Sequence, residues 1–189
     1  MGEWFQTIAD IDATPEQAPE LATTVLGWLI EQGIVVADKS DCTSGDDGHA
    51  PGPNYTSAVT STYPYLHELR PNGLQVITGR TVFYSMGAKQ ITCPHCGVAI
   101  DFDLDSAQPD NAWETVSATI DTWYSGGSDT HCCPTCGRSA GLNEWRWEPP
   151  WGFGYLGFDF WNWPPLTDDF VTDVSRQLGH RVVCPYGKL

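Results

Sequence analysis

The chain is poor in basic residues and has no long apolar run, and each shortage excludes a class of protein. Nine Lys and Arg stand against 24 Asp and Glu among 189 residues, so the formal net charge is −15. Such a charge repels nucleic acid and anionic membranes and favours a basic protein partner, although it also serves solubility alone. No apolar run approaches the roughly 18 residues that cross a bilayer. The first residues lack the basic and apolar regions of a signal peptide, and we therefore expect a cytoplasmic protein without membrane contact.

Motifs for enzymatic chemistry are also missing. The sequence contains no nucleotide-binding motif and no pair of acids placed for general acid–base catalysis. Cys42 with His49 or His67 is a nucleophile–base pair that the sequence permits without supporting it. We therefore expect a protein without enzymatic activity, and an enzyme that uses an aromatic-rich cleft remains an alternative.

Both ends of the chain predict a strand, a helix and a second strand. The N-terminal set covers residues 3–12, 13–33 and 34–38, and Thr14 and Gln17 form a capping box at the start of the helix. The C-terminal set covers residues 155–163, 166–179 and 180–184, with Thr167 as the helix cap and Gly179 as its stop. In each helix the apolar residues recur at helical spacing and form one face.

Two such halves predict an α+β fold, in the form of a ferredoxin-like βαββαβ sandwich. Residues 1–38 and 151–189 would be the halves, residues 39–92 a loop and strand insertion, and residues 93–150 a zinc-ribbon-like module. A less regular mixed sheet is the alternative. Within the insertion, residues 74–85 predict one bent strand or a hairpin around Gly79, and residues 113–123 predict a helix. The apolar residues from Val98 to Leu104 alternate with aspartates, which is typical of a strand.

Four of the seven cysteines predict a metal site. Cys93, Cys96, Cys133 and Cys136 form two Cys-Pro-x-Cys-Gly units, and in a reducing cytosol this spacing indicates a metal rather than disulfides. Four thiolates suit tetrahedral Zn²⁺, and a site closed by four protein ligands is structural rather than catalytic. Redox-active cysteine pairs and an iron–sulfur centre remain alternatives.

The neighbouring residues raise a question of register. Cys132 precedes Cys133 directly, but only Cys133 reproduces the first Cys-Pro-x-Cys-Gly unit, so we take Cys133 as the ligand. His95 and His131 lie next to the cysteines, and we expect both of them on the surface.

A segment rich in tryptophan follows the second cysteine pair. Trp145, Trp147 and Trp151 are a candidate interaction surface, because exposed indoles stack on bases or peptide groups. The alternative is that these tryptophans pack the zinc module against the rest of the fold. Stacking on nucleic acid also needs a basic groove, and Arg146 is the only cation in this segment.

The C-terminal part resembles a known family. The stretch PPWGFGYLGFDFWNWPPL, followed by LGH and a closing GKL, is similar to a group of uncharacterised small bacterial proteins that contain a zinc ribbon. Their pattern also includes a strand like GRTVFYS before the first cysteine pair. The resemblance implies a soluble bacterial protein with an intact cysteine set, and it implies no activity. Some relatives carry a sugar-transporter ATPase label, which this sequence does not support.

These observations favour a non-enzymatic, zinc-stabilised protein-binding module. One concrete form is an acidic inhibitor or immunity-type protein that masks a basic partner. A nucleic-acid-binding zinc ribbon is the alternative, and it requires a basic face that the sequence does not show.

Overall fold

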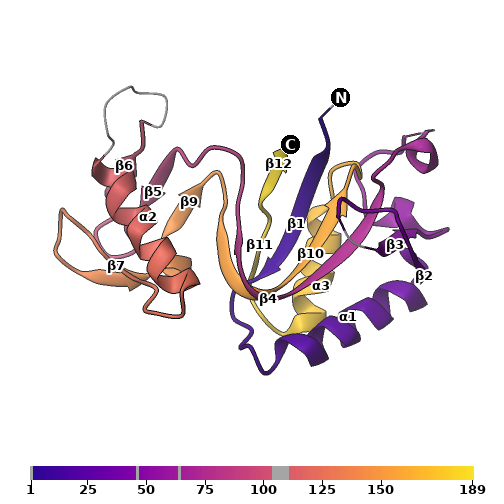
Figure 1. Cartoon of the computed structure of the whole chain (residues 1–189), viewed down its shortest axis with the longest axis horizontal. Coiled ribbons are helices and arrows are strands. Elements are labelled where there is room, and N and C mark those ends of the chain that lie inside the picture. The colour runs from indigo at the N-terminus through magenta and orange to yellow at the C-terminus, as the bar shows by residue number, and fades with distance from the viewer. Residues whose placement is uncertain (1, 46, 64, 104–110) are drawn as a thin grey trace.

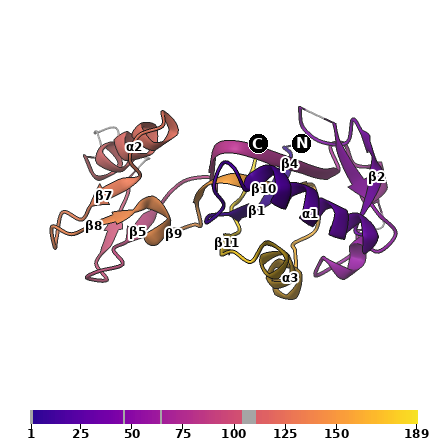
Figure 2. The same ribbon diagram turned by 90° about the horizontal axis from the view of Figure 1, so that it is seen from below.

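The computed structural model describes residues 2–45, 47–63, 65–103 and 111–189 and shows two lobes (Figure 1). Residues 2–83 and 152–189 form the sheet lobe, and residues 84–151 form the cysteine module, which projects from one end of the sheet (Figures 1 and 2). The sheets are antiparallel and three α-helices accompany them within the described ranges, which confirms the predicted α+β class.

The sheet lobe is built on a seven-stranded sheet, counted over the described residues. The strand order is β11-β1-β10-β4-β3-β2, and β12 also pairs with β1. The strands are β1 (Trp4–Asp10), β2 (Val35–Ser40), β3 (Gly48–Pro51), β4 (Gly73–Phe83), β10 (Gly152–Trp161), β11 (Val182–Val183) and β12 (Tyr186–Lys188). Helices α1 (Ala18–Glu31) and α3 (Asp168–Leu178) contact each other and pack on the sheet. Two short 3-10 helices, η1 (Tyr55–Ser57) and η2 (Leu66–Glu68), lie between β3 and β4.

The core of this lobe lies between the two helices and the sheet. Ile8 of β1, Leu29 of α1 and Phe158 of β10 are fully buried in one apolar cluster. Trp28 of α1 stacks on Phe170 of α3, with ring centroids 6.3 Å apart. The apolar residues at helical spacing in the sequence therefore form the buried faces of both helices.

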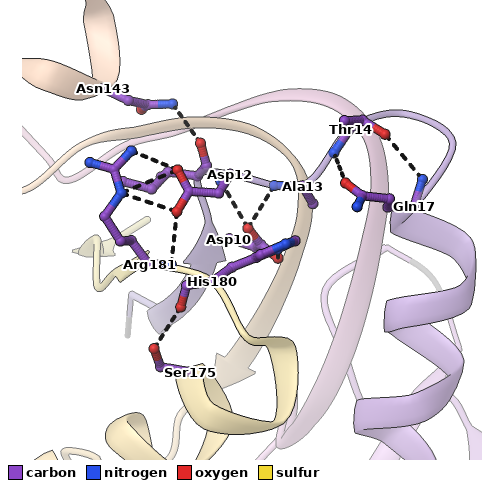
Figure 3. Close-up of polar contacts among 10 residues, drawn as sticks. Asp10, Asp12, Ala13, Thr14, Gln17, Asn143, Ser175, His180 and Arg181 are labelled. Carbon is purple, nitrogen blue, oxygen red and sulfur yellow. Dashed lines mark hydrogen bonds and ion pairs between the residues drawn. The ribbon is translucent and has the colours of Figure 1, made fainter.

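The hydrogen bonds predicted at both helix starts are present, but Thr14 does not cap α1, whose N-cap is Gln17 and has no side-chain cap bond. Thr14 and Gln17 exchange hydrogen bonds, from the Thr14 N–H to Gln17 Oε1 at 3.0 Å and from the Gln17 N–H to Thr14 Oγ1 at 3.3 Å (Figure 3). This box closes the turn just before α1, which begins at Ala18. In α3 the hydroxyl of Thr167 accepts the Phe170 N–H at 3.1 Å, and Gly179 ends the helix in the left-handed conformation.

The structure corrects the predicted boundary of the insertion. Residues 39–92 are not separate from the main sheet, because they supply β3 and β4, and β4 pairs with β10 along its length. Leu74 and Val76 of β4 pack into the same core as the helices, and their partners on β10 lie far away in sequence. Residues 73–83 form one strand rather than a hairpin, with Gly79 at a positive φ of 102°.

The finer topology stays a prediction. The expected second strand, β2, lies at the edge of the sheet and is separated from β10 by β3 and β4. The ferredoxin-like form is therefore not confirmed. The expected strand from Val98 is present as β6 (Ala99–Asp101), and Leu104 lies outside the described residues.

Asp159 on β10 places a carboxyl group in the sheet at 9% exposure. Loss of water raises its pKa to about 6, although a hydrogen bond from the Thr7 hydroxyl partly opposes the rise. The folded state therefore binds a proton more tightly than the unfolded chain does. This carboxyl is neutral in both states only well below its ordinary pKa of 3.8, and its destabilising effect grows as the pH rises from there to about 6.

We expect Asp159→Asn to stabilise the protein near neutral pH. The amide keeps the acceptor oxygen for Thr7 and removes the charge, so the gain in unfolding free energy is up to about 3 kcal/mol at pH 7.5. At pH 4 the variant and the parent are expected to differ by less than about 1 kcal/mol. Urea unfolding of both proteins from pH 4 to pH 8 measures the difference, and a gain that does not change with pH would contradict this account.

Candidate metal centre

The cysteine module holds two hairpins that carry the two cysteine pairs. Strands β5 (Gln90–Thr92) and β6 form the first hairpin, and β7 (Thr130–Cys132) and β8 (Ser139–Gly141) form the second. Strand β9 (Arg146–Glu148) pairs with β5 and leads the chain back to the sheet lobe. Helix α2 (Asn111–Tyr124) connects the hairpins, and the 3-10 helix η3 (Leu142–Glu144) follows the second one. Each cysteine pair therefore lies at the tip of a short antiparallel hairpin.

The four thiols meet at one point. The sulfur atoms of Cys93, Cys96, Cys133 and Cys136 all lie within 4.8 Å of one another. The Sγ atoms of Cys93 and Cys136 are 3.9 Å apart, and those of Cys96 and Cys133 are 3.8 Å apart. A tetrahedral ion with metal–sulfur bonds of about 2.3 Å requires sulfur–sulfur distances of about 3.8 Å. The cluster therefore has the dimensions to hold one metal ion, and the spacing is too long for disulfide bonds.

The backbone forms the same hydrogen-bonded turn at both cysteine pairs. The N–H of Gly97 donates to the Cys93 carbonyl at 3.0 Å, and the N–H of Gly137 donates to the Cys133 carbonyl at 2.9 Å. Both glycines have a φ near +70°, a conformation that a side chain would strain. The N–H of His95 also points to the Cys93 sulfur, at 3.4 Å. This repeated turn explains the glycine after each second cysteine.

The surroundings favour negative charge on the Cys133 sulfur and oppose it on the Cys96 sulfur. Backbone N–H groups of Cys136 and Thr135 lower the pKa of Cys133 to about 6, although loss of water opposes the change. A backbone hydrogen bond to Val98 lowers the pKa of Cys96, but loss of water and the three other thiols outweigh it and raise the pKa to about 11. Cys133 therefore provides the first thiolate near neutral pH. Binding of a cation to the set would release the remaining protons.

The structure separates the two adjacent cysteines. Cys133 is buried within the cluster, whereas Cys132 is exposed on β7, and its sulfur lies 3.9 Å from the Cys133 carbonyl oxygen. Successive residues of a strand point to opposite sides, so neighbouring cysteines do not both face the same ion. The predicted choice of Cys133 agrees with this placement.

The two histidines beside the cysteines differ from each other. His95 is exposed, as expected, and its Nε2 lies 3.0 Å from the Ser139 carbonyl on the second hairpin. The expectation that His131 lies on the surface is wrong. Its ring is buried against Trp145, with ring centroids 5.3 Å apart, and its Nδ1 lies 3.2 Å from the Thr119 hydroxyl. Burial lowers the pKa of His131.

The structure also corrects the candidate interaction surface. Trp145 and Trp147 are buried in the module, with 3% and 6% exposure, and Trp151 is half-buried. Trp147 stacks on Trp151 with ring centroids 5.4 Å apart, and its indole N–H donates to the Leu142 carbonyl. A module with only short strands needs bulky side chains to form a core, and these indoles supply that volume. These tryptophans therefore pack mainly inside the module, and Trp147 also contacts Phe153 of β10, with ring centroids 5.4 Å apart.

Contacts that sequence spacing does not reveal join the module to the sheet lobe. The guanidinium of Arg80 on β4 lies over the rings of Trp123 and Tyr155, at 5.0 and 5.1 Å, and it donates to the Trp123 carbonyl at 2.6 Å. The amide of Asn143 donates to the carbonyls of Ile11 and Phe153 and accepts the Phe153 N–H. These bonds fix both the end of α2 and η3 against the sheet.

A second polar cluster lies where β1 leaves the sheet (Figure 3). The carboxylate of Asp10 is fully buried, and it accepts the N–H groups of Asp12 and Ala13, each at 2.9 Å. Its other oxygen lies 2.8 Å from His180 Nδ1, in the turn between α3 and β11. Asp12 forms a two-pronged ion pair with Arg181 next to it, which lowers the pKa of Asp12. The cluster joins the two ends of the chain, and each of its acids already has partners within the fold.

The remaining catalytic candidates do not form an accessible site. Cys42 and His49 are both buried, and His49 Nδ1 lies 2.9 Å from the Val36 carbonyl. The side chain of His67 lies outside the described residues.

None of the helices that the structure describes is long and apolar enough to cross a membrane.

Comparison with known proteins adds no relative. No family model, curated protein or solved structure matches this chain.

Proposed function

We propose that the four cysteines bind one Zn²⁺ in a structural role. The observation that carries this proposal is the meeting of four sulfurs at tetrahedral spacing, with two matching turns behind them. Thiolates are soft ligands that select zinc over magnesium or calcium. Four protein ligands leave no coordination position for water or substrate, so the ion would hold the hairpins together rather than activate a reactant.

We further propose that the chain is a non-enzymatic binding protein for a partner of positive charge, of the inhibitor or immunity type. The formal charge of −15 supports this, together with how little of that charge is neutralised. Within the described part of the chain, Arg176 and Arg181 are the only Lys or Arg side chains that form ion pairs with carboxylates. Exposed carboxylates without partners raise the association rate with a cationic surface.

Capture of a partner at different salt concentrations tests the binding proposal. We expect the immobilised protein to retain a partner of high isoelectric point from lysate at 50 mM salt, and to form a complex of fixed stoichiometry with it after purification. The association rate is expected to fall at least about tenfold between 50 and 500 mM salt, because salt screens charges beyond about 10 Å. Hen lysozyme, a basic protein with no specific relation to the chain, is the control. Retention of lysozyme alone would contradict the proposal.

We also propose a finer topology and a family for this chain. Part of the sheet has the strand order β11-β1-β10-β4. Along the chain, α1 lies between β1 and β4, and α3 lies between β10 and β11. This arrangement supports a ferredoxin-like sandwich that β3 and β2 extend at one edge. Membership of the small bacterial zinc-ribbon family stays a proposal that rests on the C-terminal residue pattern.

A further inference from the structure

A large pocket lies in the sheet lobe, away from the cysteine module. Its volume is about 1080 Å³, and it is formed by the start of β1, the loop after β10, the outer side of α3 and the last residues of the chain. Ligand pockets are commonly about 300–1,000 Å³ and lined mainly by apolar side chains. The N and C termini lie side by side at this end of the sheet (Figure 1). The site is therefore assembled from segments far apart in the sequence.

Exposed aromatic side chains gather around this pocket. Trp4 and Tyr186 are each 54% exposed, Tyr63 is 46% exposed, and all three line the pocket. Trp163 lines it too, at 5% exposure, and its indole N–H has no acceptor among the described residues. Large apolar side chains that stay exposed together mark binding sites, and a buried N–H without an acceptor costs free energy that a ligand oxygen would relieve.

Two acidic and two basic side chains line the pocket, and they differ in the partners that they have. Glu3 already accepts the side-chain N–H of Asn162, and Asp168 lies in the first turn of α3, where the helix dipole favours a carboxylate. Arg70 and Lys188 have no carboxylate partner within the described residues. Arg70 donates to the neighbouring Leu69 carbonyl, and the Lys188 ammonium lies 5.3 Å over the Trp4 ring. The lining therefore holds two carboxylates that already have a hydrogen-bond or helix-dipole partner, and two cations that form no ion pair with a described carboxylate.

We propose that this pocket binds a small acid with a ring-bearing apolar body. The rings of Trp4, Tyr63 and Tyr186 would pack on the apolar body, and Arg70 and Lys188 would bind the carboxylate. The negative field of the chain repels anions at long range, so Arg70 and Lys188, which form no ion pair with a described carboxylate, would favour an acidic head group at this pocket over the rest of the surface. This site is independent of the cysteine cluster and of the proposed protein partner.

Three ligands with the same ring and different head groups test the proposal. Naphthalene-2-carboxylate, 2-naphthylmethanol and 2-naphthylmethylammonium would compete with the fluorescent probe 8-anilinonaphthalene-1-sulfonate on the full-length protein. We expect the carboxylate to bind about tenfold or more tightly than the alcohol, because hydrogen bonds to charged groups add to the shared ring contact. We expect the ammonium ligand to bind most weakly. Equal affinities for the carboxylate and the alcohol would overturn the proposal.

Variants locate the binding to this pocket. Arg70→Gln with Lys188→Gln should weaken the carboxylate about tenfold and leave the alcohol unchanged. Lys39→Gln with Arg176→Gln removes two exposed cations that do not line the pocket and is the matched control for net charge.

A third variant fills the pocket. Thr172→Trp, at an exposed position of α3 that lines the pocket, should weaken binding of all three ligands. Circular dichroism of each variant checks that it is folded. An equal loss of affinity in the two double variants, or no effect of Thr172→Trp, would place the ligand elsewhere and refute the assignment.

Discussion

Cys133→Ser is expected to remove the bound metal and to unfold the cysteine module, whereas Cys132→Ser is expected to do neither. Cys133 is buried among the four sulfurs and has the lowered pKa, and Cys132 is exposed outside the cluster. Structural zinc in small modules contributes about 10–16 kcal/mol of apparent binding free energy that is also folding free energy. Loss of one of four ligands therefore removes a large part of the stability of the module.

Metal analysis and protease digestion measure both effects. The parent and Cys132→Ser proteins should each carry about one Zn²⁺, and Cys133→Ser should carry close to none. Limited proteolysis should cut Cys133→Ser within residues 84–151 at rates at least about a hundredfold above the parent, because local unfolding controls cleavage. A chelator should give the parent the same cleavage pattern. If Cys132→Ser lost the metal instead, the assignment of ligands would be reversed.

Asp10→Ala is expected to cost about 3–5 kcal/mol of unfolding free energy, the largest effect of any substitution in the sheet lobe that we predict. Asp10 is fully buried, and its carboxylate accepts two backbone N–H groups and pairs with His180. Its loss leaves the buried N–H of Ala13 without an acceptor and leaves the imidazole without its carboxylate.

Asp12→Ala is the matched control for Asp10→Ala. Asp12 belongs to the same cluster and forms a two-pronged pair with Arg181, but both of these side chains reach solvent. An exposed pair contributes about 1 kcal/mol or less, so this variant should lose far less stability. Urea unfolding followed by far-ultraviolet circular dichroism gives both values. Equal losses in the two variants would show that burial of Asp10 adds nothing.

Local features of the structure could be predicted from the sequence because their causes are local. The Thr14–Gln17 box and the Thr167 cap depend on residues three positions apart. The cysteine set follows from a pattern repeated twice, and the repeat also selects Cys133 over Cys132. In each case the side chains that interact lie within a few residues of one another, or the two copies of one motif identify each other.

The features that could not be predicted from the sequence depend on contacts between residues far apart in the chain. The position of β4 beside β10 depends on a pairing between Leu74 and Phe160, and neither residue indicates the other. The burial of His131 and Trp147 depends on how α2 packs over the hairpins. The pair of Asp10 and His180 spans almost the whole chain. The pocket likewise combines both termini with the loop around Arg70, so no single stretch of sequence indicates it.

The insertion of the module between two paired strands has a kinetic consequence. Strands β4 and β10 pair from Gly73 opposite Trp161 to Phe83 opposite Gly152, yet residues 84–151 separate them in the chain. Closing so long a loop slows folding, because its entropy is lost before the pairing contributes. In the proposed metal-bound form, the folded module would bring Phe83 and Gly152 together and shorten the search. The supply of the proposed metal during synthesis would then set how long the apolar strand β10 lacks β4 as a partner and stays open to aggregation.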